Sequence, residues 1–433
     1  MLEMIPLVIV EGFLGGAGPF VWGNFEHCLN ASSSETRPVF FASVGPVSSL
    51  HDRACELYYQ LMGGTVDYGE QHSKTHRHGR YGRKHRQGLY PQWSIDSPLH
   101  FLGHSMGGPT IIKLQYLLKQ SYFGGRGHPD MILSVTTISS PFRGTPIVYT
   151  LGEHIDAAPA VRPWSIGDLI AKFVHIIAYL KPLLPESLDI WHSECRSLSF
   201  HEIPFSGFLR ELWKSSWATS RDAAPFDVTF MAADEREAKM EGEPNPGTFY
   251  KSFAAFMTQK DTTHTPAFKY SISVLPVYLT YRLIAKFDLS SVLPVPSFLQ
   301  GRDLDADTRM SCVCAGAERS QNGYGPNVEE GLYMRRLSPS EISDEYREND
   351  GVVPVFSQWH PLPCRMTRCR HYPVDRPSKP SVPEPGVWHT QEVADATHAS
   401  IVPFWLSTSR QRVFWIEVGD WLRKIDEAQD LRN

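Results

Sequence analysis

Uninterrupted apolar runs alternate with helical patterns along much of the chain. A continuous aliphatic and β-branched run is typical of a strand buried on both faces of a parallel sheet. Such runs predict strands at 5–10, 39–44, 99–102, 132–138 and 248–255. Apolar positions recurring every three or four residues predict helices at 53–62, 109–118, 165–181, 208–213 and 413–431. The alternation indicates an α/β fold with a mostly parallel central sheet and helices on both faces.

The middle of the chain and two later stretches do not follow this alternation of strands and helices. Ser165 opens an amphipathic helix, and Asp168, three residues later, completes a short-armed form of a capping box. Residues 296–345 and 362–386 are polar and rich in Pro, Arg and Ser. We predict that both stretches are long surface loops.

One short motif stands between a predicted strand and a predicted helix: Gly103-His104-Ser105-Met106-Gly107. In that setting it predicts a nucleophile elbow, a turn so tight that the flanking positions have no room for side chains. The turn would lift the Ser105 hydroxyl clear of the sheet, and the helix N-terminus behind it favours negative charge. The alternative interpretation is a plain glycine-rich turn.

The amino-acid composition limits the classes of protein to which this chain can belong. The 433 residues are 42% hydrophobic with a net charge of −5, which suits a globular protein and gives no basic patch for nucleic acid. The seven cysteines are scattered and odd in number, which argues against a disulfide framework and favours a reducing compartment. Cys312/Cys314 and Cys364/Cys369 have the irregular spacings C-x-C and C-x4-C, which argue against a zinc ribbon.

No apolar run is long enough to span a bilayer, so we expect no transmembrane segment. The run 5–10 continues into Glu11-Gly12-Phe13 without a cleavage-type boundary, so the sequence as written predicts no signal peptide. The cellular location stays open.

Longer motifs around the elbow resemble the thermoalkalophilic bacterial lipases of the Geobacillus/Staphylococcus type. These motifs lie at 44–49, 52–56, 63–69, 133–138, 217–222, 348–353 and 386–388. The resemblance is dense over the first 145 residues and patchy after about 260. It implies an α/β-hydrolase fold in one domain, 1–433, with a zinc-loop insertion at 47–90 and a lid insertion at 149–226.

The resemblance implies a Ser-Asp-His triad of Ser105, Asp350 and His398, in the chain order that this fold requires. A serine hydroxyl needs an imidazole to take its proton, and the imidazole needs a carboxylate to orient it. Without the resemblance, Asp350-Gly351 would be interpreted as an ordinary turn and His398 as a buried, satisfied histidine.

The backbone N–H groups of Phe13 and Met106 are the expected donors to the oxyanion. Related lipases usually have a histidine where this chain has Glu11. A carboxylate near a developing anion would slow the reaction, so we expect Glu11 to point away or to be neutralised.

The histidine-rich stretch 71–78 resembles the zinc loop of these lipases, and their ligands map to Asp52, His72, His78 and Asp222. Two imidazoles and two carboxylates suit a tetrahedral structural zinc ion. The alternative is a solvated basic loop. The family's calcium site is not expected, because residues 399–403 contain no carboxylate.

The helix 165–181 matches the lid of these lipases, and we expect Phe173, Ile177 and Leu180 to face an apolar acyl cleft when it is closed; a plain core helix is the alternative. The predicted function is a lipase or carboxylesterase that hydrolyses acylglycerol-type esters, with a lipid ester substrate and a lipid–water interface as the expected partners. The rivals are a phospholipase or acyltransferase with the same triad, and a non-catalytic lipid-binding relative.

Overall fold

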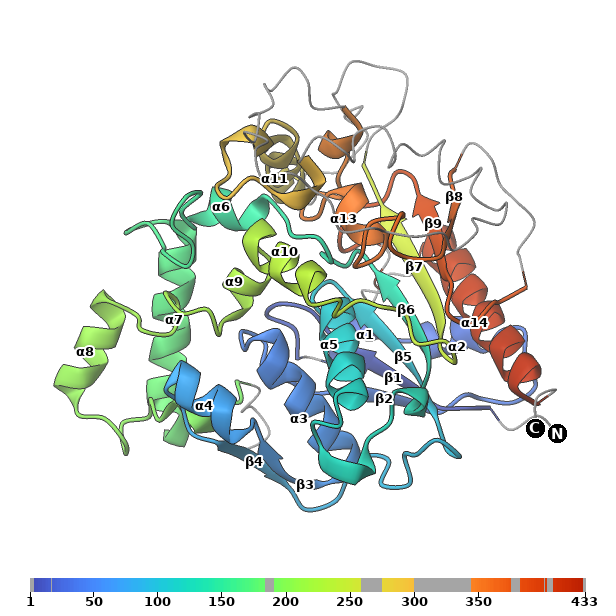
Figure 1. Ribbon diagram of the computed structural model, residues 1–433, viewed down its shortest axis with the longest axis horizontal. Helices are drawn as coiled ribbons and strands as arrows, with labels where there is room; N and C mark the ends of the chain where they lie inside the picture. Colours follow the sequence, from blue (N-terminus) through green and yellow to red (C-terminus); the bar gives the residue numbers. More distant parts are fainter. Residues whose placement is uncertain are drawn as a thin grey trace, which may run out of the picture.

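The computed structural model describes residues 4–16, 18–183, 191–257, 275–299, 344–374, 382–400, 402 and 408–430. Its centre is a seven-stranded sheet (Figure 1). In spatial order the strands are β2 (Val39–Ala42), β1 (Leu7–Val10), β5 (Leu99–His104), β6 (Ile132–Ile138), β7 (Phe249–Ala255), β9 (Trp388–Val393) and β8 (Cys369–Tyr372). Every recorded neighbouring pair in this sheet is parallel, so the predicted α/β class with a mostly parallel sheet is confirmed.

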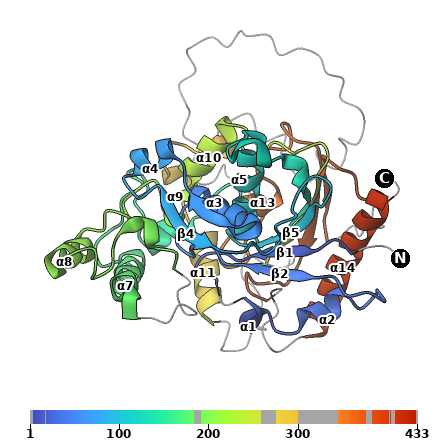
Figure 2. The same ribbon diagram turned by 90° about the horizontal axis from the view of Figure 1, so that it is seen from below.

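Helices cover both faces of the sheet (Figure 2). One face carries α3 (Leu50–Met62) and α5 (Gly107–Lys119), and the other carries α1 (Pro19–Trp22), α2 (Phe25–Leu29) and α14 (Ser409–Asp430). In β1, Val8 and Val10 pack into the first layer, whereas Leu7 and Ile9 pack into the second. Both faces of the strand are therefore buried, which explains its unbroken apolar sequence.

A small antiparallel sheet of β3 (Gly64–Asp67) and β4 (Tyr81–His85) lies outside the central sheet. Between these strands the chain forms α4 (Glu70–His76), where the sequence analysis expected a histidine-rich loop. This helix begins after Gly69 and ends at Arg77, whose left-handed φ of 58° stops it. His72 is therefore held on a helix.

Further helices lie at the end of the sheet where the predicted site residues gather. They are α6 (Ile147–Leu151), α7 (Ile166–Leu180), α8 (Phe205–Trp213), α9 (Ala224–Asp227), α10 (Phe230–Ala238), α11 (Leu275–Ala285) and α13 (Val355–Trp359). Figures 1 and 2 both show α7 and α8 side by side at the edge of the molecule. The α7 helix starts as expected, because the Ser165 side chain accepts the Asp168 N–H at 3.2 Å.

Within the described ranges, no helix combines the length and apolar character needed to cross a bilayer. The expected surface loop 362–386 contains the edge strand β8, which is too short and polar to stand out from its neighbours in the sequence. Most of the other expected loop, 296–345, lies outside the described residues, as do Cys312 and Cys314.

Candidate active site and metal centre

Ser105 stands at the turn between β5 and α5 with a positive φ of 54°, a strained backbone for a residue with a side chain. The flanking glycines have no room for a methyl group. A Cβ on Gly103 would lie 2.3 Å from the Gly108 nitrogen, and a Cβ on Gly107 would lie 1.9 Å from the Val10 carbonyl oxygen. The predicted turn geometry is therefore present.

His398 and Asp350 are hydrogen-bonded to each other. The His398 Nδ1–H donates to Asp350 Oδ2 at 2.8 Å, and the His398 backbone N–H donates to the Asp350 carbonyl at 2.9 Å. The other carboxylate oxygen accepts the Val352 and Val353 N–H groups at 2.9 and 2.7 Å, so the fully buried carboxylate is fixed. No hydrogen bond joins Ser105 to His398 in the described part of the chain, and such bonds commonly tighten only when substrate is bound.

His104 connects the turn to the His398 loop. Its Nε2 is 2.9 Å from the His398 carbonyl oxygen, and the two rings lie 4.9 Å apart between centroids. Desolvation, with the charge of His398 next in weight, lowers the pKa of His104 to about 3. His104 therefore stays neutral and adds no second cation beside the predicted base.

The loop after β1 lies directly against Ser105. A Cβ on Gly12 would stand 2.5 Å from Ser105 Cβ and 3.0 Å from its Oγ. The next residue, Phe13, lines the same cavity as Ser105 and Met106. Neither the Phe13 nor the Met106 backbone N–H donates to another atom of the described chain. Both predicted oxyanion donors thus belong to backbone segments that meet at Ser105.

The Glu11 side chain is turned away from Ser105 and holds the loop together. Its carboxylate accepts the backbone N–H groups of Gly16 and Gly18 at 2.7 and 3.1 Å, and the indole N–H of Trp22 at 2.9 Å. Arg53 donates to the Glu11 carbonyl oxygen. Glu11 therefore points away from Ser105, as expected, and its carboxylate is the centre of a hydrogen-bond network under the loop.

The four predicted metal ligands converge from three parts of the chain. Asp52 lies in α3 and His72 lies in α4. His78 follows two residues after the end of α4, and Asp222 lies just before α9. His72 Nε2 lies 3.1 Å from Asp52 Oδ1 and 3.2 Å from Asp222 Oδ1, and His78 Nε2 lies 3.3 Å from Asp222 Oδ2. The structure therefore contains a group able to hold a metal ion.

Two buried polar atoms of this group, His78 Nε2 and Asp222 Oδ1, have no hydrogen-bond partner among the described residues. An ion at the centre would satisfy both. The His78 Nδ1, on the other side of the ring, is 2.8 Å from the Gly79 carbonyl, and an Nδ1–H tautomer leaves Nε2 facing the centre.

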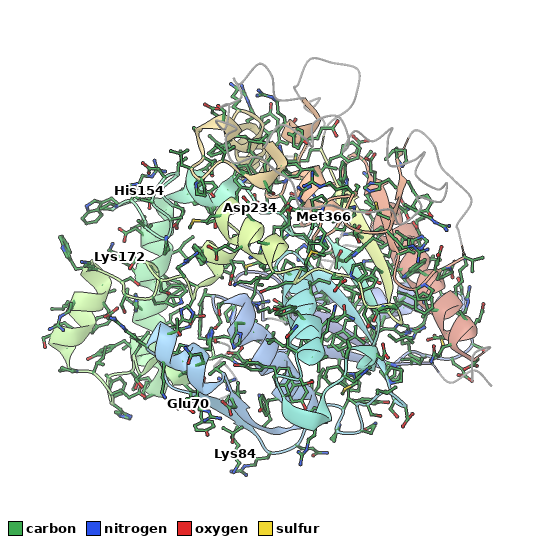
Figure 3. All side chains as sticks on the ribbon, viewed as in Figure 1. Glu70, Lys84, His154, Lys172, Asp234 and Met366 are labelled. Atoms are coloured by element: carbon green, nitrogen blue, oxygen red, sulfur yellow. The ribbon has the colours of Figure 1, made fainter. Side chains whose placement is uncertain are left out.

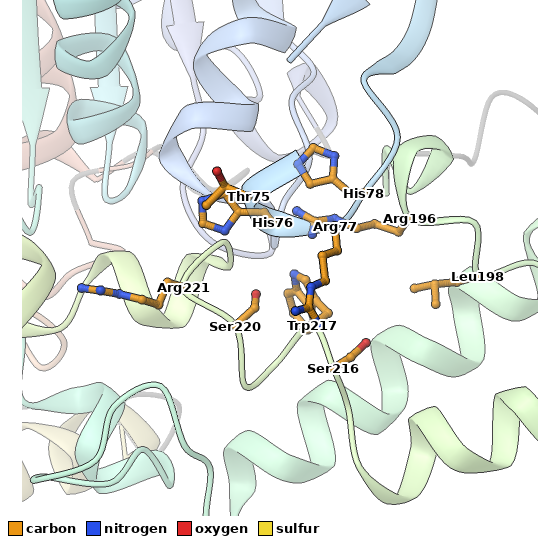
Figure 4. A pocket seen from close by; sticks show the side chains of 10 residues that line it. All are labelled: Thr75, His76, Arg77, His78, Arg196, Leu198, Ser216, Trp217, Ser220 and Arg221. Atoms are coloured by element: carbon orange, nitrogen blue, oxygen red, sulfur yellow. The ribbon is translucent and has the colours of Figure 1, made fainter. Parts of the chain in front are cut away.

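Arg196 completes the charge balance around these ligands. Its Nη2 lies 2.8 Å from Asp52 Oδ2 and 2.7 Å from Asp222 Oδ2. His78 and Arg196 also line a pocket of about 430 Å³, together with Trp217. Figure 4 shows the side chains around it. Burial would raise the pKa of Asp222, but the close approach of His72, His78 and Arg196 outweighs it and keeps that pKa well below its usual range.

Comparison with known proteins agrees with this geometry. Residues 4–166 match a family model described as a lipase-like, C-terminal domain. A lipase of Staphylococcus hyicus is 30% identical over 281 residues, covering 59% of this chain and 41% of that protein. Lipase 2 of Staphylococcus aureus is 26% identical over 389 residues, covering 83% of this chain and 45% of that protein. Over these stretches the chain is similar to the staphylococcal lipases.

The chain spans less than half the length of the curated relatives it matches. The crystal structure of Staphylococcus hyicus lipase superposes with a TM-score of 0.69 at 22% identity, covering 98% of this chain and 97% of that chain. The resemblance indicated by the sequence motifs is thus confirmed, and so is the α/β-hydrolase-like fold.

Ser105 lies in the wall of an apolar cavity of about 310 Å³. Glu153 is the acidic residue in its wall, and Ala160 donates its N–H to that carboxylate at 2.8 Å. Burial raises the pKa of Glu153 to about 7. Below about pH 7 the carboxyl group is therefore mostly neutral, and the cavity wall carries little charge.

The α7 helix forms one wall of this cavity, but with a different face from the one expected. The wall residues are Gly167, Ile170 and Ala171. The expected Phe173, Ile177 and Leu180 do not line it, and Phe173 is 55% exposed. In this structure the face of α7 that meets the cavity carries two small residues, Gly167 and Ala171, and the expectation for the closed lid stays a prediction.

Sequence reasoning did not find Arg196, Glu153 or the role of Glu11. Arg196 stands far from the ligand motifs and carries no local pattern that could reveal its two carboxylate partners. Trp22 and Glu11, by contrast, flank the glycine-rich loop in the sequence. A buried tryptophan needs a partner for its indole N–H, and that requirement was a usable signal.

Proposed function

We propose that this chain is a lipase or carboxylesterase that cleaves acylglycerol-type esters through a serine acyl-enzyme. The observation that carries the proposal is the position of Ser105, which combines a positive φ with a place in the wall of an apolar cavity. The fixed pair of Asp350 and His398 beside the same turn supports it. The names of the homologous lipases agree with it.

In the first step, Ser105 Oγ attacks the ester carbonyl carbon while His398 Nε2 takes the hydroxyl proton. Asp350 fixes the Nδ1–H tautomer and stabilises the imidazolium that forms. The Phe13 and Met106 N–H groups donate to the carbonyl oxygen as it becomes an oxyanion. The C–O bond to the alcohol then breaks, and His398 returns the proton to the leaving oxygen.

In the second step, water attacks the acyl-enzyme while His398 again takes a proton. The oxyanion collapses, the bond from the acyl carbon to Ser105 Oγ breaks, and Ser105 recovers its proton from His398. The acyl chain lies in the apolar cavity during both steps and is released as the carboxylic acid.

We propose that α7 acts as the lid and meets lipid with its outer side. Leu169 and Phe173 are more than half exposed on that side. Trp164 before α7 and Trp213 at the end of α8 are 72% and 80% exposed, and their rings lie 6.4 Å apart. Exposed apolar residues in this density mark a surface for an apolar partner.

We also propose that Asp52, His72, His78 and Asp222 hold a structural zinc ion. Tetrahedral bonds of about 2.0–2.1 Å place neighbouring ligand atoms about 3.4 Å apart, close to three of the separations here. Zinc, when bound, supplies a cross-link between α3, α4 and the segment before α9. Metal analysis tests this proposal. We expect H72A/H78A to lose about one zinc ion per chain and to have a lower Tm than the wild type. An unchanged metal content would contradict the proposal.

Hydrolysis of an ester series tests the function. We expect cleavage of long-chain esters that disappears in Ser105→Ala while the variant stays folded. A preference for phospholipid headgroups, or transfer to an added alcohol in place of water, would favour the phospholipase or acyltransferase alternative. Folded protein without hydrolysis would indicate a non-catalytic lipid-binding relative.

A further inference from the structure

A second cluster of metal-ligand side chains lies at the far edge of the sheet. His360 follows α13, Cys364 lies in the next turn, and Cys369 and His371 are alternate residues of β8. Alternate residues of a strand share one face, so both β8 side chains point the same way. Met366, in the turn between the cysteines, marks the region in Figure 3.

The separations in this cluster match those of a tetrahedral metal site. His360 Nε2 and His371 Nε2 are 3.2 Å apart, and Cys364 Sγ is 3.6 Å from each of them. With Zn–N of about 2.05 Å and Zn–S of about 2.3 Å, a tetrahedron gives about 3.4 Å between nitrogens and about 3.6 Å between nitrogen and sulfur. All four ligand atoms, including Cys369 Sγ, lie within 4.8 Å of one another.

The surroundings orient the ligands. His360 Nδ1 is 2.5 Å from the Leu362 carbonyl oxygen, so an Nδ1–H donor leaves the Nε2 lone pair facing the cluster. The His371 ring packs edge-on against Trp359 at 4.9 Å. His360 is 1% exposed, and neither cysteine is in a disulfide bond. The site is therefore shaped from one buried and three half-buried ligands.

We propose that His360, Cys364, Cys369 and His371 bind a zinc ion as a Cys2His2 site, separate from the Asp52 group. Binding deprotonates both thiols and releases two protons, and the two thiolates then neutralise the charge of Zn²⁺. With four protein ligands no position stays open for water, so the ion serves structure alone.

The position of the Cys2His2 site in the fold indicates its structural role. His360 ends the segment that begins with Asp350 and continues through α13. Cys369 and His371 belong to β8, which lies at the edge of the sheet among the described residues and pairs there with β9. The ion would tie the end of this segment to the edge strand, and so stiffen the support below the Asp350 loop.

Metal content and cobalt spectroscopy of the full chain test the proposal. We expect about two zinc ions per chain, falling to about one in C364S/C369S and to about one in H72A/H78A. Cobalt-loaded wild type and H72A/H78A should show a near-ultraviolet sulfur-to-cobalt charge-transfer band, because only this site contains thiolates. Cys28→Ser, which changes a half-buried cysteine of α2, is the matched control and should keep both the band and the metal content.

Absence of the band from cobalt-loaded wild type would contradict the proposal, even where C364S/C369S does not fold. An unchanged metal content in folded C364S/C369S would also contradict it. A Cys364–Cys369 disulfide, found by mass spectrometry in the native protein, would replace the metal site with a covalent link and equally overturn the proposal.

Discussion

Gly12→Ala probes the contact between the oxyanion loop and the nucleophile. The added methyl group would stand 2.5 Å from Ser105 Cβ, 3.0 Å from its Oγ and 3.1 Å from the His104 carbonyl oxygen. Non-bonded carbon atoms are stable at about 3.5 Å or more, so the loop must retreat by about 1 Å. The retreat carries the Phe13 N–H away from the oxyanion position.

The size of the effect follows from that displacement. A misplacement of about 1 Å can cost about 100-fold in rate, and loss of one oxyanion donor costs about 100- to 1,000-fold. We expect kcat/KM for a small soluble ester to fall about 100-fold, equivalent to about 2.7 kcal/mol. The fall should appear in kcat, with KM nearly constant, because the oxyanion exists only in the transition state.

Gly125→Ala is the matched control, because its Cβ would meet no atom within 4 Å. Initial rates and Tm are measured for both variants, since crowding alone can cost about 1–3 kcal/mol of stability. A folded Gly12→Ala protein with kcat within about twofold of wild type would refute the assignment of this loop.

Other predictions follow from the same geometry. Asp350→Asn should lower kcat about 10,000-fold in initial-rate assays, because the amide favours the wrong tautomer of the base; a loss under tenfold would argue against the triad. Trp22→Phe should cost about 1–3 kcal/mol in urea unfolding by leaving a Glu11 oxygen unpaired, and an unchanged midpoint would contradict that network. The Glu153 carboxyl holds its proton in the folded state up to about pH 7, so its stabilising contribution is present below about pH 4.5 and is lost as pH rises through 7. Glu153→Gln should therefore raise Tm more at about pH 9 than at about pH 5, and equal shifts would be inconsistent with a raised pKa. A chelator should lower Tm, and this effect should shrink when both predicted histidine ligands of the Asp52 group are replaced; equal sensitivity would exclude that group as the cause.

Elements with local signals were predictable from the sequence. The core strands are unbroken apolar runs, and β6 occupies the predicted range. The elbow was predictable because its glycines and strained serine lie within five consecutive residues. The α3 helix starts at Leu50, earlier than its apolar periodicity suggests, because Ser49 caps it by accepting the Asp52 N–H.

Elements that depend on distant partners were not predictable. Strands β3, β4 and β8 are short and polar, and pairing alone defines them. Asp350 and His398 carry no local signal that separates them from a turn aspartate and a core histidine, so the family resemblance was needed to choose them. The irregular Cys364/Cys369 spacing argued against a zinc ribbon, and the sequence did not reveal that two histidines complete the cluster.

Labelling with a fluorophosphonate, followed by peptide mass spectrometry, tests the central claim most directly. The account predicts one modified residue, Ser105, in the wild-type protein, and strongly slowed labelling in folded His398→Ala. Labelling at another residue, or equal labelling rates in the two proteins, would contradict the account.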